Sequence, residues 1–289
     1  MLSSNVTNAI EVRNLSKSFI DFRLQDISFD LPKGCILGLI GENGAGKSTT
    51  IRLIMNSLAK DSGSVRVLGV DNGDPAFRQV KNDIGVVLDE AYFPAVINTQ
   101  IVDKMMASTY TNWSSSTFRR YLRRLELPEK RPFKEFSRGM KMKLSIAVAL
   151  SHDPKLLILD EATSGLDPIV RDEILDIFND FTRDPDHSIL ISSHILSDLE
   201  KICDYIAFIH KGQLMFCEEK DRLTDAYGLL YCSWRELEDV PQEAICGRRS
   251  SDYGVTCLVR RDLISPAFDV QKATIEDIML YQVKGEKRK

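Results

Sequence analysis

A glycine-rich segment near the N-terminus constrains the fold of this chain more than any other feature. The segment is Gly41-Glu42-Asn43-Gly44-Ala45-Gly46-Lys47-Ser48, which matches the pattern G-x-x-x-x-G-K-[ST]. It follows Cys35 to Ile40, a continuous apolar run typical of a strand buried on both faces. It precedes Lys47 to Leu58, where apolar residues recur with helical spacing. A strand, a glycine-rich loop and a helix in this order predict a phosphate-binding loop.

The residue types in this loop suit a nucleoside triphosphate. The glycines let backbone N–H groups converge on phosphate oxygens, and the helix that follows adds the positive end of its dipole. Lys47 would reach the β- and γ-phosphates, and the Ser48 hydroxyl would bind Mg²⁺. The loop alone fits nucleotide kinases, GTPases, helicases and transport ATPases equally well. The candidate nucleotide-binding residues of the loop are Gly41, Asn43, Gly44, Ala45, Gly46, Lys47, Ser48 and Thr49.

A second apolar run, Leu156 to Leu159, ends in two carboxylates, Asp160 and Glu161. The carboxyl ends of parallel strands face the ligand crevice, so both acids are expected near the phosphates. Asp160 would hold Mg²⁺, and Glu161 would orient and polarise the attacking water. The alternative is an ordinary strand end with two exposed acids. Downstream, His194 follows a further predicted strand and is interpreted as a γ-phosphate sensor, although a lone histidine at such a place is more often structural.

Composition narrows the class of protein. The chain has 289 residues, of which 43% are hydrophobic, so it can bury a sizeable core. Its 38 Lys plus Arg against 42 Asp plus Glu give 38 − 42 = −4, which argues against a general nucleic-acid binder. No run approaches the length of a membrane helix, and the start does not resemble a signal peptide, so we expect a soluble cytosolic protein. The cysteines form no C-x-x-C pair that would suggest zinc.

The order of the apolar patterns predicts an α/β fold with an addition. Strand and helix signals alternate along 9–222, except that a helical insert interrupts them at about 90–152. Beyond this domain, residues 223–289 have short mixed segments that end in a helical piece, Thr274 to Val283. We expect 223–289 to form a small C-terminal α+β accessory module.

The segment Phe136-Ser137-Arg138-Gly139-Met140 distinguishes among the phosphate-loop classes. It lies between the loop and the acidic strand and resembles the L-S-G-G-Q signature of ABC transporter ATP-binding subunits, a resemblance that covers roughly residues 9–222. The resemblance implies a P-loop ATPase of ABC type with an antiparallel β part and an inserted helical subdomain. It also implies that two chains close head to tail around two ATP molecules. Without the resemblance, Ser137 would be interpreted merely as a helix cap.

The same resemblance assigns roles to further positions. Phe19 sits where an aromatic ring stacks on adenine, and Asp89 falls at the glutamine-loop position near the metal. Asp167 lies in the loop that crosses the dimer interface, and His194 matches the switch histidine. The signature residues Ser137, Arg138, Gly139 and Met140 are expected to contact ATP held by the other subunit.

Three positions depart from the family pattern. Asp89 replaces the usual glutamine, which adds a negative charge beside a polyphosphate and predicts altered metal coordination. Arg138 replaces a glycine, so it would either supply positive charge to a γ-phosphate in trans or point to solvent. Met140 replaces a glutamine. The two signature changes look like variants found among bacterial drug- and antibiotic-exporter ATPases.

The resemblance predicts a Mg²⁺-dependent ATPase that powers an ABC transporter, with an exporter as the closest pattern. The chain would dock on a separate integral-membrane subunit at the inner face of the cell membrane, as a homodimer or with another ATP-binding subunit. Residues 91–97 lie where family members contact such a partner, or else form core of the helical insert. The alternative function is a soluble ABC-type ATPase acting on ribosomes or DNA, and a nucleotide kinase ranks third.

Overall fold

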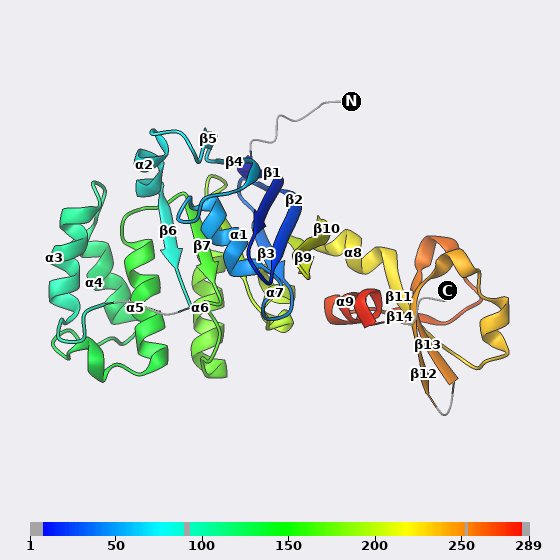
Figure 1. Ribbon diagram of the computed structural model, residues 1–289. Coiled ribbons are helices and arrows are strands. Elements are labelled where there is room, and N and C mark those ends of the chain that lie inside the picture. Colours follow the sequence, from blue (N-terminus) through cyan, green and yellow to red (C-terminus); the bar gives the residue numbers. More distant parts are fainter. Residues whose placement is uncertain (1–7, 90–92, 252–253, 285–289) are drawn as a thin grey trace. The chain divides into compact units, whose positions relative to one another are not determined.

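The computed structural model describes residues 8–89, 93–251 and 254–284 of the chain (Figure 1). The chain divides into two compact units, Met1–Cys217 and Glu218–Lys289. The division falls a few residues before the boundary that the sequence pattern predicts at 222.

The first unit is built on a ten-stranded mixed sheet with the order β5-β4-β1-β2-β10-β9-β3-β8-β7-β6. One side is antiparallel and the other, from β9 to β6, is parallel. The strands are β1 (Asn8–Ser18), β2 (Arg23–Pro32), β3 (Ile36–Ile40), β4 (Ser62–Val67), β5 (Val70–Asp71), β6 (Ile84–Val87), β7 (Leu156–Asp160), β8 (Ser188–Ser192), β9 (Tyr205–His210) and β10 (Gln213–Glu219).

The parallel strands that carry the site are the most buried. All five residues of each of β3, β7 and β8 are buried, which explains why these segments are apolar without alternation. β8 lies between β7 and β3 and pairs with both. Its residue Ser192 stands opposite Asp160 of β7 on one side and opposite Leu39 of β3 on the other. The ends of β3, β7 and β8 therefore meet at one edge of the sheet.

Helix α1 (Lys47–Ile54) packs the antiparallel part onto the parallel part. Its apolar face carries Ile51, Leu53 and Ile54, which belong to one core cluster with residues of β1, β2, β4, β7 and β8. The helix ends at Ile54, earlier than the predicted Leu58, because Asn56 adopts a left-handed backbone with φ 50°. This packing fixes the helix N-terminus, and with it Lys47, against the sheet.

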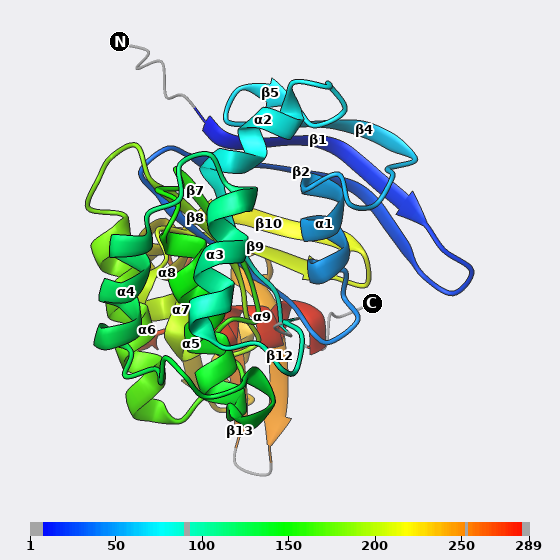
Figure 2. The ribbon, with the colours of Figure 1, turned by 90° about the vertical axis from the view of Figure 1, so that its left-hand side faces the viewer.

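A helical insert follows β6. It contains α3 (Thr99–Thr109), α4 (Ser115–Arg124) and α5 (Arg138–Leu150), which group together on one side of the unit (Figure 2). Asn98 and Ser114 cap α3 and α4 by accepting backbone N–H bonds. After the insert, α6 (Pro168–Phe181) connects β7 to β8, and α7 (Leu196–Ile202) connects β8 to β9.

The second unit has its own sheet and core. Its strands are β11 (Tyr227–Cys232), β12 (Ile245–Ser251), β13 (Gly254–Arg260) and β14 (Val270–Lys272), in the antiparallel order β12-β13-β11-β14. Cys257 and Val259 form part of its buried apolar cluster. Helix α8 (Lys220–Ala226) precedes the sheet, and α9 (Ile275–Lys284) contacts β12 and β13. This is the small α+β module that the sequence predicts.

Candidate nucleotide site

The loop between β3 and α1 wraps closely around backbone groups. A Cβ at Gly41 would clash with the carbonyl oxygen of Ile209 in β9, and Gly46 has φ 117°, in the region that favours glycine. Gly44 has open space where a Cβ would stand. These glycines let the loop bring its backbone to the N-terminus of α1, as a phosphate-binding loop requires.

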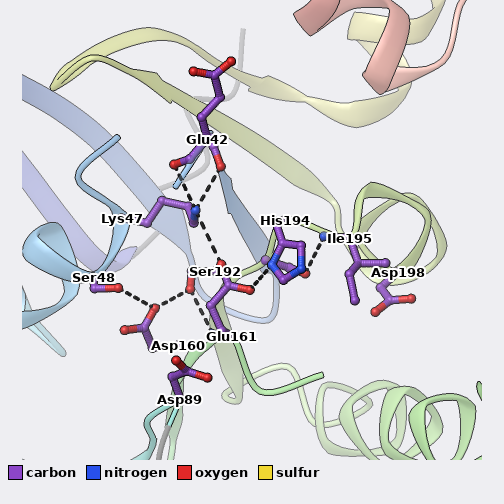
Figure 3. A network of polar contacts seen from close by, with 12 residues as sticks. Glu42, Lys47, Ser48, Asp89, Asp160, Glu161, Ser192, His194, Ile195 and Asp198 are labelled. Carbon is purple, nitrogen blue, oxygen red and sulfur yellow. Dashed lines mark hydrogen bonds and ion pairs between the residues drawn. The ribbon is translucent and has the colours of Figure 1, made fainter. Parts of the chain in front are cut away.

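Lys47 sits inside this loop and is 6% exposed. Its Nζ donates to the carbonyl oxygens of Gly41 at 2.9 Å and Glu42 at 3.3 Å. The same Nζ forms an ion pair with Glu161 Oε1 at 3.4 Å (Figure 3). The ammonium therefore stands between the loop and the carboxylate at the end of β7, where a terminal phosphate would have both groups within reach.

The two acids at the end of β7 lie in different surroundings. Asp160 is 6% exposed, and its Oδ1 accepts hydrogen bonds from Ser48 Oγ at 3.1 Å and from Ser192 Oγ at 2.6 Å. The bond from Ser48 ties the N-terminus of α1 to β7. Hydroxyl and carboxylate oxygens are the ligands that Mg²⁺ prefers.

Glu161 is held by both its backbone and its side chain. Its φ of 53° is unusual for a residue with a Cβ, and such a conformation costs about 1–3 kcal/mol. Its N–H donates to the Ser192 carbonyl oxygen and hydroxyl, both at 3.1 Å. Its Oε2 lies 2.5 Å from His194 Nδ1 (Figure 3). The predicted catalytic pair, Glu161 and His194, is thus in direct contact.

A cavity of about 650 Å³ opens beside these groups. Its lining contains ten of the residues predicted for the site: Asn43, Gly44, Gly46, Lys47, Ser48, Thr49, Asp89, Arg138, Glu161 and His194. Asp21, Phe22 and Ser164 also line it, and the sequence analysis did not single them out. Gly41 and Ala45 of the loop and Asp160 of β7 do not line the cavity.

The aromatic residue at the cavity is Phe22. Phe19 does not line the cavity; it is 46% exposed, and its ring centroid lies 6.2 Å from that of Phe22. Phe22 also packs beside the position of a Cβ on Gly46. The stacking of Phe19 on adenine remains a prediction. Phe22 is a second candidate for this stacking because its side chain lines the cavity.

The two charged departures from the family pattern contact one another. Arg138 Nη2 donates to Asp89 Oδ1 at 3.2 Å, and the Arg138 guanidinium lies against Gly165. Both side chains are more than half exposed. In the single chain Arg138 therefore faces its own cavity and neutralises the extra carboxylate there.

The remaining predicted residues stand at helix starts. Ser137 caps α5 by accepting the N–H of Met140 at 3.2 Å, and Gly139 lies in the first turn of the same helix. Asp167 caps α6 by accepting the N–H of Val170 at 3.1 Å. Ile169, beside it, is 83% exposed. Ser137 and Asp167 do not line the cavity, and their place in a dimer remains a prediction.

Two further results concern the class of protein. Within the described ranges, no helix has the length and apolar character that crossing a bilayer requires. Those ranges also contain no cluster of three or more His, Cys, Asp or Glu side chains of the kind that holds a metal by itself. A metal at Ser48, Asp160 and Asp89 would need further ligands from phosphate oxygens, as is usual for Mg²⁺.

Comparison with known proteins agrees with this geometry. Residues 24–164 match the family model described as ABC transporter. The chain is 38% identical over 216 residues to the lantibiotic transport ATP-binding protein SrtF of Streptococcus pyogenes, covering 73% of this chain and 91% of SrtF. It is 35% identical over 213 residues to the bacitracin transport ATP-binding protein BcrA of Enterococcus faecalis, covering 71% of this chain and 68% of BcrA.

A solved structure described as the ATP binding subunit of an ABC transporter has the same fold. It is 28% identical, covers 75% of this chain and 92% of its own, and superimposes with a TM-score of 0.68. The named relatives are transport proteins, which favours transport over action on ribosomes or DNA.

Proposed function

We propose a function from one premise: this chain belongs to the ABC transporter family of ATP-binding proteins. It binds and hydrolyses ATP as the subunit that powers a transporter, and its partners are a second ATP-binding subunit and an integral-membrane subunit. The observation that carries the detailed proposal is the meeting of Lys47, Ser48, Asp160, Glu161 and His194 at one edge of the sheet (Figure 3). Residues 9–222 form the catalytic domain in this proposal, and 223–289 form the accessory module.

Nucleotide binding begins with a change of partners at Lys47. Its Nζ exchanges the carbonyl oxygens of Gly41 and Glu42 for the β- and γ-phosphates, which carry full negative charge. The backbone N–H groups from Asn43 to Thr49 cradle the phosphates at the N-terminus of α1. The adenine stacks on an aromatic ring of the β1–β2 connection, and Phe22 is the ring that lines the cavity.

Ser48, Asp160 and Asp89 are the proposed ligands of Mg²⁺, and their oxygen donors fit that ion. When bound, Mg²⁺ supplies positive charge that stabilises the transferring phosphoryl group. To act as a metal ligand, the Asp89 carboxylate would give up its hydrogen bond from Arg138.

Hydrolysis uses Glu161 as the base that orients and polarises the attacking water. His194 holds the Glu161 carboxylate in place before the nucleotide binds, since Nδ1 and Oε2 are in hydrogen-bond contact. Binding of the γ-phosphate then gives His194 a second anionic partner. Through that contact the histidine reports whether the terminal phosphate is present.

ATP closes two chains head to tail, and hydrolysis reopens them. Ser137 and Gly139 at the N-terminus of α5 contact the γ-phosphate held by the other chain, and Met140 lies in the same turn. Asp167 lies on the loop that crosses between the chains, and the exposed Ile169 follows it in the first turn of α6. The second chain is another copy of this protein or a related ATP-binding subunit.

The helical insert transmits this motion to the membrane subunit. Val96 is 76% exposed, and Ile101 and Met105 of α3 are also exposed apolar side chains. Phe93 packs edge-on against Phe133 at 5.5 Å between ring centroids, so it supports the insert from within. Tyr92, the other aromatic residue of this segment, lies outside the described residues. The chain thereby attaches peripherally to the cytoplasmic face of the membrane.

The transported substrate is proposed by likeness. SrtF is named for the transport of a lantibiotic, and BcrA is named for the transport of bacitracin. We propose export of a compound of this type, at a membrane subunit that provides the specificity.

The test is a pull-down with Glu161→Gln in Mg-ATP from detergent-solubilised membranes of the native cell. The variant is expected to bind ATP, lose turnover and retain a multi-span protein in stoichiometric amount. Ribosomal or nucleoid proteins in place of a membrane subunit would overturn the transport function. Near-normal hydrolysis would remove Glu161 from catalysis.

A further inference from the structure

Ser192 carries a fully buried hydroxyl at the end of β8, beside the end of β7. It is the last residue of β8 and is 0% exposed. Its Oγ donates to Asp160 Oδ1 at 2.6 Å and accepts the N–H of Glu161 at 3.1 Å (Figure 3). One side chain therefore contacts both acids at the end of β7.

The direction of these bonds follows from the number of protons. A serine hydroxyl has one proton, and the Glu161 N–H is itself a donor, so the hydroxyl proton points to Asp160. Asp160 Oδ1 thus receives two hydroxyl bonds, from Ser48 and Ser192. Within the described part of the chain, no hydrogen bond reaches Asp160 Oδ2. The carboxylate is oriented through one oxygen while the other keeps its capacity as a ligand.

The hydrogen bond from the Glu161 N–H to the Ser192 hydroxyl helps to fix the backbone conformation of Glu161. Glu161 has a left-handed φ of 53°, and its N–H is shared between the Ser192 hydroxyl and carbonyl oxygens. A strained conformation persists only where its surroundings determine it from several sides. The hydroxyl therefore helps to aim the Glu161 side chain, which contacts Lys47 and His194.

We propose that Ser192 is a positioning residue that couples the metal-binding carboxylate of Asp160 to the orientation of Glu161. The inference rests on the proposed roles of Asp160 and Glu161. It predicts that the hydroxyl contributes to turnover and to the use of Mg²⁺, while it contributes little to ATP binding without the metal. Removing a hydrogen bond to a charged group reduces the corresponding rate or affinity by about 10- to 100-fold.

The same strand offers a matched control. Ser188, at the other end of β8, is also 0% exposed, and its Oγ accepts the N–H of Gly34 at 3.0 Å. Ser188→Ala removes a buried hydroxyl from the same strand without touching Asp160 or Glu161. Any loss that comes only from weakening β8 should appear in both alanine variants.

The experiment compares Ser192→Ala, Ser192→Cys, Ser192→Thr and Ser188→Ala in the full chain. For each variant we would measure kcat and KM for Mg-ATP, equilibrium binding of a fluorescent ATP analogue with and without Mg²⁺, and thermal unfolding without nucleotide. Ser192→Ala is expected to lower kcat about 10- to 100-fold and raise the half-saturating Mg²⁺ concentration, with binding in EDTA changed less than twofold. Ser192→Cys keeps the side-chain shape but bonds weakly, so it should also lose kcat, whereas Ser192→Thr should recover most of it.

Two results would overturn the proposal: a kcat within twofold of the parent for Ser192→Ala, or equal kcat losses in Ser192→Ala and Ser188→Ala. If the added methyl group prevents Ser192→Thr from folding, these two alanine variants and Ser192→Cys decide the matter. Glu161→Gln is assayed in parallel. Loss of hydrolysis in Glu161→Gln with unchanged Ser192→Ala overturns only the role of Ser192, whereas near-normal hydrolysis in Glu161→Gln overturns the catalytic proposal itself.

Discussion

Removing the Arg138 guanidinium is expected to lower the Mg²⁺ concentration that ATP binding requires. Arg138 Nη2 lies 3.2 Å from Asp89 Oδ1 in the single chain, and we propose that carboxylate as a metal ligand. A carboxylate oxygen that is paired with a guanidinium is less available to a cation. Arg138 and Mg²⁺ therefore compete for Asp89, and Arg138→Ala removes one competitor.

The size of this effect follows from the exposure of the pair. The Arg138 and Asp89 side chains are 59% and 54% exposed, so water screens their attraction. Two unit charges at this separation in water attract by about 1.3 kcal/mol, and measured exposed pairs contribute about 0.2–1 kcal/mol. At about 1.4 kcal/mol for a tenfold change, the half-saturating Mg²⁺ concentration should fall about 1.4- to 5-fold.

The assay is a Mg²⁺ titration of fluorescent ATP-analogue binding, at a protein concentration low enough to keep the chain monomeric. Arg138→Ala is measured alone and in an Asp89→Asn background, where it should have no further effect on the Mg²⁺ midpoint. Raising the salt concentration should shrink the difference, because exposed ion pairs are screened. An unchanged or higher midpoint in Arg138→Ala would refute the reasoning, as would the same shift in the Asp89→Asn background.

Two more predictions concern the adenine and the helical insert. Phe22→Leu should weaken ATP-analogue binding about 5- to 150-fold, which corresponds to about 1–3 kcal/mol of base stacking. Binding by Phe19→Leu should stay within twofold of the parent. The reverse ranking in the same titration would assign the adenine to Phe19. Burial lowers the pKa of His152 to about 4 from 6.5, so the unfolded chain takes up this proton first as the pH falls. Folding stability should therefore decrease between pH 6.5 and 4, by at most about 3 kcal/mol from this group. Urea unfolding across that pH range should show a smaller decrease in His152→Phe, and an identical decrease would exclude His152 as its source.

Local sequence patterns predicted the elements that carry the chemistry because those patterns have local physical causes. The run Leu156 to Leu159 is apolar without alternation since both faces of β7 are covered. The helix after the phosphate loop begins at Lys47, as the spacing of Ile51 and Ile54 indicates. The end of that helix was predicted too late, since apolar periodicity continues beyond the turn at Asn56.

Contacts between distant segments were beyond the reach of such patterns. Nothing in the local sequence around Ser192 distinguishes it from Ser188 on the same strand. Their different partners follow from the register of β8 against β7 and from its proximity to the loop before β3. Phe19 and Phe22 are likewise both phenylalanines in the connection between β1 and β2. Only the conformation of that connection decides that the Phe22 ring lines the cavity.

The sequence by itself determined which chemical groups this protein has for ATP, because a phosphate loop needs glycines, a lysine and a hydroxyl at a set spacing along one strand–loop–helix unit. It equally determined that two acids end a buried strand. The tertiary structure alone decided which of these groups touch: Ser48 with Asp160, Glu161 with His194, and Arg138 with Asp89. The physical reason is that strand order and register bring together residues far apart in the chain, and no local propensity contains that information.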